Sequence, residues 1–307
     1  MLLRPATAAD LPEAAGVWGA AWHDGHDGHV AEELVAARTP EYFLSRISEL
    51  LECTTIAVGD EGQILGVVIV VDDEFSQLAV ADSGRRGGVG AALLAAAEEQ
   101  VAAAGHGTIW LAVVEGNARA RGFYERRGWT DEGPTVYRAR SAGGAIPVPV
   151  QRYEKRLTVV AVESPRNVGV AELLRGGEAF AESLYPAEEN FILPLEALEG
   201  ADATVFVARV GGEALGMAAL VQHGSDYELK RLFVSEAARG QGLAGLLLDA
   251  LEEHARDAGA VVIRLETGNR SDAAIALYER RGYTHIPRFG EYADSASSVC
   301  MQLLLVE

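Results

Sequence analysis

Two short stretches of the sequence combine arginine with closely spaced glycines, and each directly follows an apolar run. Residues 85–90 read RRGGVG and residues 239–244 read RGQGLA. Glycines in this spacing let the backbone turn tightly and leave its N–H groups unobstructed. At the start of a helix such N–H groups form an anion site, which the leading Arg85 or Arg239 would reinforce. Each stretch therefore predicts a site for a phosphate-bearing ligand, with a diphosphate as the natural guest.

A tyrosine follows each glycine-rich stretch at the same distance along the chain. YERRGW begins at Tyr124 and YERRGY at Tyr278, and the interval of 154 residues between them also separates Arg85 from Arg239. A phenol hydroxyl can donate a proton to a leaving group, so each tyrosine is a candidate general acid. One short motif has many false matches, but two copies in one register argue against chance.

The repeat predicts two copies of one domain, residues 1–157 and 158–307. In each copy a short strand and one or two helices precede three apolar runs typical of strands. A long amphipathic helix, a buried strand, the helix that carries the tyrosine and closing strands follow. Antiparallel strands followed by a β–α–β unit give a mixed sheet flanked by helices. We therefore expect an α/β chain of two tandem domains, each with a mixed, mostly antiparallel sheet.

The composition argues against several classes of partner. Lys and Arg number 26 against 45 Asp and Glu, and the formal net charge of -19 at pH 7 repels nucleic-acid phosphates and anionic lipid. The longest apolar runs are far shorter than the ~18 residues of a membrane span, and the first residues show no apolar signal region. Cys53 and Cys300 are the two cysteines, and they indicate neither a disulfide framework nor a cysteine zinc site. We expect a cytoplasmic protein that binds neither nucleic acid nor a membrane.

The paired motifs resemble those of the GNAT superfamily of acetyl-CoA-dependent N-acyltransferases. The GNAT signature, Arg/Gln-x-x-Gly-x-Gly/Ala after the fourth strand, matches both copies, and the GNAT motif Asn-x-x-Ala-x-x-x-Tyr matches residues 117–124. The second copy departs from that motif at Ser271, which replaces the asparagine, and the first copy has Arg86 where the second has Gly240. The resemblance covers nearly the whole chain and implies two tandem GNAT-like acetyltransferase domains, with acetyl-CoA as co-substrate.

The resemblance also implies how acetyl-CoA would be held. Its pantetheine arm would lie like an extra strand where the fourth and fifth strands splay, bonded to the backbone of residues 78–80 or 232–234. The implied cofactor-binding residues are Leu78, Ala79, Val80, Arg85, Arg86, Gly87, Gly88, Val89, Gly90 and Asn117 in the first copy, and Leu232, Phe233, Val234, Arg239, Gly240, Gln241, Gly242, Leu243, Ala244 and Ser271 in the second.

The same resemblance assigns roles in the reaction. In GNAT enzymes an amine attacks the thioester directly and the CoA thiolate leaves. Tyr124 and Tyr278 occupy the position from which the GNAT tyrosine donates a proton to that sulfur. A base must also take the proton of the amine. We predict Glu228 and Glu266, at strand ends of the second copy, as catalytic carboxylates, while a solvated strand end and a water relay stay open as alternatives.

The stretch HDGHDGH, residues 23–29, places three of the seven histidines together. Three imidazoles could bind a metal, but they would have to converge at ~2.1 Å from one ion, and the glycines favour a loop. In GNAT proteins the segment after the first helix forms one wall of the acceptor site. We therefore expect His23, His26 and His29 to line that wall without a metal, with His23 or His26 as a candidate base. In the second copy the corresponding wall is residues 182–190, where Tyr185 and Glu188 are predicted to contact the acceptor.

The sequence thus predicts an N-acetyltransferase that acts on a primary amine of a small molecule, as a monomer or a homodimer. Two alternatives stay open. One is an enzyme of antibiotic modification or self-resistance, which acidic walls would suit if the substrate is cationic. The other is a chain in which one half only binds acyl-CoA. For the chemical step we favour the second half, because RGQGLA follows the GNAT pattern at every position whereas Arg86 interrupts the first copy.

Overall fold

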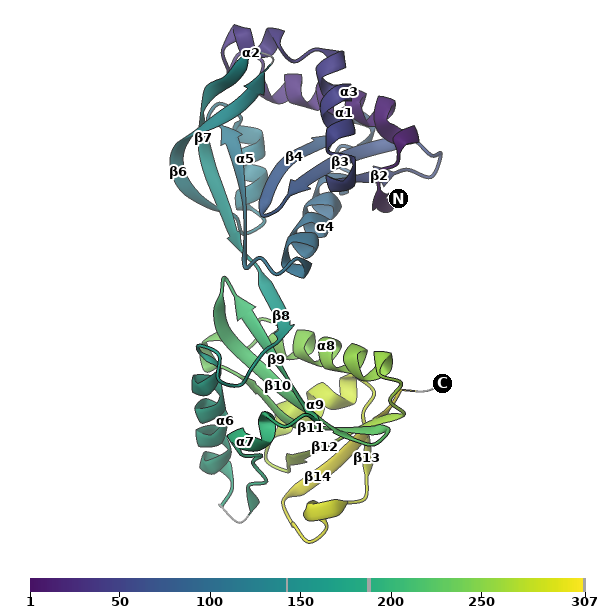
Figure 1. Cartoon of the computed structure of the whole chain (residues 1–307), viewed down its shortest axis with the longest axis vertical. Coiled ribbons are helices and arrows are strands. Elements are labelled where there is room, and N and C mark those ends of the chain that lie inside the picture. Colours follow the sequence, from purple (N-terminus) through teal and green to yellow (C-terminus); the bar gives the residue numbers. More distant parts are fainter. Residues whose placement is uncertain (142, 187–188, 306–307) are drawn as a thin grey trace. The chain divides into compact units, whose positions relative to one another are not determined.

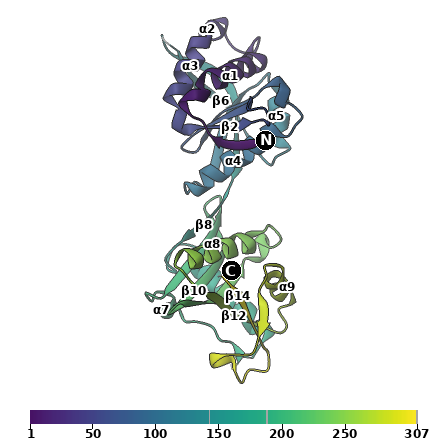
Figure 2. The ribbon, with the colours of Figure 1, turned by 90° about the vertical axis from the view of Figure 1, so that its right-hand side faces the viewer.

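The computed structural model describes residues 1–141, 143–186 and 189–305 of the chain. The chain divides into two compact units, Met1–Leu157 and Thr158–Glu307. Each unit contains one seven-stranded sheet with helices packed on both of its faces (Figures 1 and 2). The expectation of two tandem α/β units with mixed, mostly antiparallel sheets is confirmed.

The first unit builds its sheet in the order β1-β2-β3-β4-β5-β7-β6. Only the neighbours β4 and β5 run parallel; the other pairs are antiparallel. The elements are β1 (Leu2–Pro5), α1 (Leu11–His26), α2 (Glu32–Ala36), α3 (Pro40–Glu49), β2 (Thr54–Val58), β3 (Ile64–Val71), β4 (Glu74–Val80), α4 (Val89–Ala103), β5 (Thr108–Val114), α5 (Ala118–Glu125), β6 (Thr130–Ser141) and β7 (Gly144–Arg156).

The second unit repeats this order, with β8 to β12 in the places of β1 to β5, and β13 and β14 in those of β6 and β7. Its single parallel pair is β11 with β12. The elements are β8 (Thr158–Val162), α6 (Val170–Leu184), α7 (Leu195–Leu198), β9 (Ala203–Val210), β10 (Glu213–His223), β11 (Asp226–Val234), α8 (Leu243–Asp257), β12 (Val262–Gly268), α9 (Asp272–Arg280), β13 (Thr284–Ile286) and β14 (Ser298–Leu304).

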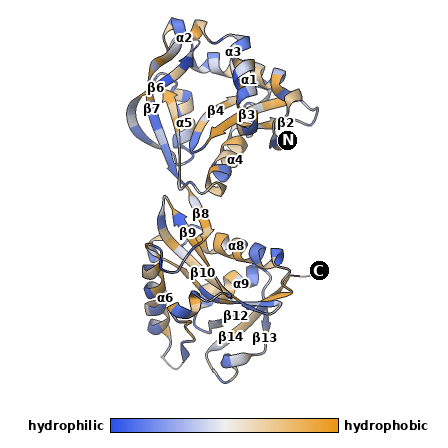
Figure 3. Ribbon diagram, viewed as in Figure 1, coloured by the Kyte–Doolittle hydropathy of each residue, from blue (hydrophilic) through white to orange (hydrophobic). Residues whose placement is uncertain are grey.

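Strand β3 shows why the first sheet is covered on both faces. Successive side chains of a strand point to opposite faces, so Val67 and Ile69 pack with α1 and α3, whereas Val68 and Val70 pack with α4. All four valine and isoleucine side chains are buried. The resulting unbroken apolar run, visible along β3 in Figure 3, is typical of a strand enclosed between two layers of helices.

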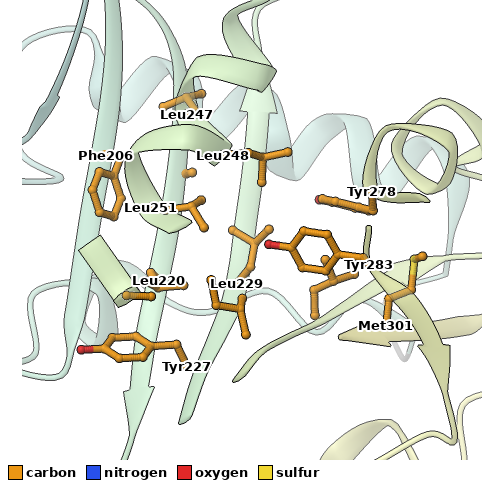
Figure 4. Packing of buried hydrophobic residues seen from close by; sticks show 14 of the residues in the cluster. Phe206, Leu220, Tyr227, Leu229, Leu247, Leu248, Leu251, Tyr278, Tyr283 and Met301 are labelled. Atoms are coloured by element: carbon orange, nitrogen blue, oxygen red, sulfur yellow. The ribbon is translucent and has the colours of Figure 1, made fainter. Parts of the chain in front are cut away.

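The second sheet follows the same alternation. Met217 and Ala219 of β10 pack with α6, whereas Ala218 and Leu220 pack with α8. Figure 4 shows the α8 side, where leucines of α8 lie over the sheet and Tyr278 of α9 joins the same cluster. Among the helices of the described residues, none is both long and apolar enough to cross a membrane.

Candidate active site

The two parallel strands of each unit separate toward their carboxyl ends. β4 and β5 pair only at Glu74 and Trp110, and β11 and β12 pair only from Asp226–Val262 to Leu229–Leu265. Beyond these points β4 stays bonded to β3, and β11 to β10, so the edge that faces the gap keeps free backbone groups. An extended chain can add to such an edge as a strand does.

A helix begins beside each gap with a glycine in the left-handed conformation. Gly88 has φ 81° before α4, and Gly242 has φ 84° before α8. A Cβ built on either glycine would meet no atom within 4 Å, so open space lies in front of each helix start. The first backbone N–H groups of a helix have no partner inside it, and they can bind an anion in that space.

Arg86 adopts the backbone conformation of its counterpart in the second unit. Its φ is 66°, and that of Gly240 is 80°. The loop of the first unit therefore has the same shape as that of the second, although a non-glycine residue pays a steric penalty in this region. The substitution that favoured the second half at the sequence level leaves the geometry of the first loop intact.

The gap and the helix start of the first unit open into one cavity of about 800 Å³. Its walls include residues of β4, β5, α1, α4 and α5. They carry five arginines, namely Arg85, Arg86, Arg119, Arg126 and Arg127. Asp24 of α1 bridges two of these, with its Oδ2 at 2.9 Å from Arg85 and 2.6 Å from Arg119. The cavity is strongly basic in a chain whose net charge is -19, which suits a ligand with several phosphate charges.

The second unit has a corresponding cavity of about 580 Å³. Arg239 and Ala244 line it at the helix start, and Glu266 and Tyr278 line it at the gap. The Arg239 guanidinium lies 4.9 Å from the centre of the Phe180 ring. The same kinds of group thus surround both cavities, with fewer arginines in the second.

The predicted tyrosines face these cavities from the helices that follow the gap. Tyr124 is 7% exposed and Tyr278 is 5% exposed. Burial raises the pKa of both phenols well above the usual range, and the charge of Glu266 adds to the rise at Tyr278. In the described residues neither hydroxyl has a recorded hydrogen-bond partner. Each is therefore protonated at neutral pH and free to donate.

Asn117 and its counterpart Ser271 begin the tyrosine helices. Asn117 Oδ1 accepts a hydrogen bond of 3.0 Å from the N–H of Ala120, and so caps α5. Ser271 makes no such cap; its Oγ lies 3.4 Å from the Tyr185 hydroxyl. Both residues line their cavities.

The two predicted carboxylates of the second unit lie in different places. Glu266 lines the cavity, accepts a 2.6 Å hydrogen bond from Ser298 Oγ, and has its pKa raised by burial. Glu228 lines a separate pocket, where it accepts a hydrogen bond from the Tyr292 hydroxyl and pairs with Lys230 at 3.3 Å. The structure brings Glu266, and not Glu228, to the same cavity as Tyr278.

His26 occupies a central position in the first unit. The expectation of a loop here is wrong for residues 23–26, because α1 continues to His26. The imidazole stacks on Trp22 with ring centres 4.5 Å apart, and its Nδ1 lies 2.8 Å from the Trp22 carbonyl oxygen. A carbonyl oxygen only accepts, so Nδ1 carries the proton and Nε2 keeps its lone pair. Burial, together with the nearby Arg38 charge, lowers the pKa of His26, which is therefore neutral at pH 7.

The other two histidines face elsewhere. His23 bonds Asp27 at 2.9 Å and the Arg38 carbonyl oxygen at 3.0 Å, and it lines a separate groove. His29 lies against Gly116. The three imidazoles do not converge, and residues 1–141, 143–186 and 189–305 contain no group of three or more His, Cys, Asp or Glu that could hold a metal ion.

The predicted acceptor wall of the second unit is described in part. Tyr185 lines the cavity, packs against Gly268, and accepts a 2.7 Å hydrogen bond from the N–H of Arg270. Glu188 lies outside the described residues. Sequence reasoning missed Lys230 of β11, which also lines this cavity. It also missed Arg38, which belongs to no motif.

Comparison with known proteins identifies the family. The acetyltransferase (GNAT) family matches residues 20–129 and 154–283. An IAA acetyltransferase of Azospirillum brasilense is 36% identical over 145 residues, which are 47% of this chain and 95% of that protein. The PaiA N-acetyltransferase of Thermoplasma acidophilum, solved in complex with coenzyme A, is similar at 16% identity over 48% of this chain and 98% of its own, with a TM-score of 0.41. A GNAT acetyltransferase of Elizabethkingia anophelis with acetyl-CoA bound is similar at 16% identity over 48% of this chain and 97% of its own, with a TM-score of 0.39.

The chain belongs to the GNAT acetyltransferase family, and the resemblance seen in its motifs is confirmed. It is a tandem GNAT enzyme, a transferase that uses an acyl-CoA and an acceptor substrate.

Proposed function

We propose that the protein transfers the acetyl group of acetyl-CoA to the primary amine of a small molecule, and that both units carry the groups for this reaction. One observation carries the proposal. In each unit a buried tyrosine, whose hydroxyl has no hydrogen-bond partner among the described residues, faces the same cavity as a splayed strand pair and a glycine-rich helix start. The similarity to a protein named IAA acetyltransferase supports acetyl as the group transferred.

The residues around each gap fit acetyl-CoA. The helix starts after Gly88 and Gly242 would bind the diphosphate through backbone N–H groups, with Arg85 and Arg239 assisting. The free edges at residues 78–80 and 232–234 would bond the pantetheine amides. Acetyl-CoA supplies an activated acetyl thioester, whose carbon forms a C–N bond to the amine as its C–S bond breaks.

Side chains of the protein would donate and accept the protons in this acetyl transfer. Tyr124 or Tyr278 would donate its phenolic proton to the departing sulfur. In the first unit, His26 Nε2 would accept the proton that the amine loses, because its lone pair is free and its imidazole is neutral. In the second unit Glu266 would accept that proton. It lines the cavity, and its raised pKa makes it a stronger base than an ordinary glutamate.

Thiol-release kinetics with acetyl-CoA and a panel of amines tests this proposal on Tyr124→Phe, Tyr278→Phe and the double variant. Each single variant is expected to lose the turnover of its own unit by about 10²- to 10⁴-fold, and the double variant should lose both. Acetyl-CoA affinity, measured by calorimetry, should stay nearly unchanged.

Tyr283→Phe is the matched control. Its ring packs 5.6 Å from that of Tyr278, and its hydroxyl is buried away from the cavity lining. This control should retain turnover. A double variant as active as the wild type would refute the role of the tyrosines.

A further inference from the structure

A second pocket, of about 270 Å³, adjoins the acetyl-CoA cavity of the first unit. We name it the acceptor pocket. It lies among α1, α3, β6 and β7, and it shares a wall with the cavity, formed by Trp18, Trp22, His26, Ser76, Gln77, Ala112 and Val114. Both spaces therefore reach the strand gap, where an acceptor amine would have to meet the thioester.

The charges around the acceptor pocket are mostly positive. Its lining has one carboxylate, Glu74, against four arginines, namely Arg38, Arg46, Arg138 and Arg140. Glu74 already accepts a 2.9 Å hydrogen bond from the Tyr137 hydroxyl. Arg46 and Arg140 both pair with Glu49, at 2.8 and 3.1 Å. A cationic acceptor would meet a basic pocket here, which argues against the cationic substrate that acidic walls would suit.

Among the described residues neither Arg38 nor Arg138 has a carboxylate partner, and Arg38 is the one of the two that is buried, whereas Arg138 is exposed. Arg38 is only 6% exposed, and its Nη1 is buried without a hydrogen-bond partner in the part of the chain that the structure describes. Its guanidinium lies over two aromatic rings, 4.1 Å from the centre of Tyr42 and 5.5 Å from that of Trp22. A buried charge without a partner is unfavourable, and a bound anion would supply the missing partner.

We propose that Arg38 binds a carboxylate of the acceptor, so that the first unit acetylates a small amine that also carries a carboxylate and an apolar or aromatic body. Guanidinium binds carboxylate through two parallel hydrogen bonds, a geometry that fixes the orientation of the ligand. Trp22, Tyr42 and Val148 provide apolar walls. The inference rests on the proposed function, because that function requires the amine of the bound acceptor to point toward the thioester.

The same indole connects the two ends of this site. His26 stacks on Trp22, and Arg38 lies over the same residue, so the proposed base and the proposed carboxylate anchor are separated by one aromatic side chain. A short molecule with its carboxylate on Arg38 would therefore present its amine near His26. Large acceptors are disfavoured because the pocket is small.

Calorimetric titration of the full chain, in the presence of saturating coenzyme A, tests the role of Arg38 without turnover. The probes are phenylalanine, tryptophan and leucine, each compared with its amide, which has the same body and amine but no carboxylate. The wild type is expected to bind at least one acid about 10- to 100-fold more tightly than its amide, the range of a hydrogen-bonded charge pair. Arg38→Gln should remove that preference and leave amide binding unchanged.

Arg46→Gln is the matched control, because Arg46 lines the same pocket but is already paired with Glu49. It should keep the preference for the acid. Thermal melting gives a second readout: Arg38→Gln should melt no lower than the wild type, since a side chain that awaits a ligand contributes little to stability.

The proposal is overturned if no acid binds better than its amide, or if Arg38→Gln keeps the preference. It is also overturned if Arg38→Gln unfolds the first unit, which would make the arginine structural. If acids bind through Arg38 but neither they nor any other amine is acetylated, the proposed function fails while the carboxylate site at Arg38 stands.

Discussion

Replacing His26 with glutamine tests the proposed base of the first unit and makes a prediction about pH. The imidazole must be neutral to accept a proton, and its pKa is lowered by burial, by Arg38 and by His23, with the Trp22 carbonyl and Asp27 acting in the opposite direction. Activity of the first unit should therefore persist at pH values where an ordinary histidine, with a pKa of 6.5, is already protonated. It should fall only on further acidification.

The expected size of the effect follows from the role. Removal of a general base costs about 10²- to 10⁴-fold in rate, or about 3–5 kcal/mol of transition-state stabilisation. The assay is the pH profile of kcat/KM for the best amine, measured in a Tyr278→Phe background so that the second unit is silent. His26→Gln should lower kcat/KM by that factor and abolish the acid limb of the profile.

His23→Gln is the control on the same helix. His23 lines a different groove, and its pKa is raised by the hydrogen bond that its imidazole donates to the Asp27 carboxylate. This variant should keep both the rate and the acid limb. If His26→Gln kept them as well, the base would have to be another group, such as Glu74 or a water molecule, and the tautomer argument would fail.

The lowered pKa of His26 also predicts a change in stability with pH, which can be measured without substrate. The folded pKa of His26 lies below its unfolded value of 6.5, so the unfolded chain binds more protons at acidic pH. The contribution of His26 is fully present above pH 6.5 and is lost as the pH falls toward the folded pKa. Denaturant unfolding at pH 7.5 and 5.5 should show a larger loss for the wild type than for His26→Gln. Equal losses would contradict the shift.

Other features give independent predictions. Calorimetric titration with acetyl-CoA should find two sites per chain. Gly88→Glu and Gly242→Glu should each remove one site, because a carboxylate would then lie before the helix start and repel the diphosphate. A single site in the wild type would exclude binding by both units. Arg86→Gly should preserve or raise the melting temperature, because the left-handed backbone costs a non-glycine residue roughly 1–2 kcal/mol; a clear drop would show that the side chain stabilises the loop. Untagged protein should contain well below one metal ion per chain by elemental analysis, whereas stoichiometric zinc that is lost in His26→Ala would make HDGHDGH a metal site.

The sequence predicted those parts of the fold and site that depend on local backbone. The gapless repeat predicted two units of one topology, and the glycine pattern predicted a tight turn before each long helix, where Gly88 and Gly242 adopt the left-handed conformation. The sequence also predicted where the tyrosines lie, because each is carried by the helix that follows the second parallel strand. These features need only short stretches of chain and their known periodicity.

Tertiary packing decided the parts that the sequence did not reveal. Gly25 favoured a loop, yet α1 runs through it, because Trp18 and Trp22 anchor the helix in the core and Gly25 lies against Asn117. Glu228 and Glu266 looked equivalent as strand ends. Glu228 lies where β11 and β12 are still paired, whereas Glu266 lies beyond the last pair and so reaches the gap.

The two units differ most where an acceptor would bind. Their acetyl-CoA sides share a loop shape, a left-handed glycine and a buried tyrosine. The proposed acceptor sides differ chemically. The first offers a neutral imidazole near Arg38, whose Nη1 has no hydrogen-bond partner in the described part of the chain, and the second offers Glu266, with Lys230 lining the same cavity. A base that is neutral when active and a base that is anionic when active favour acceptors of different charge. If both units catalyse the proposed reaction, they share the acetyl-CoA side and differ on the acceptor side, so a single amine is expected to saturate only one of them.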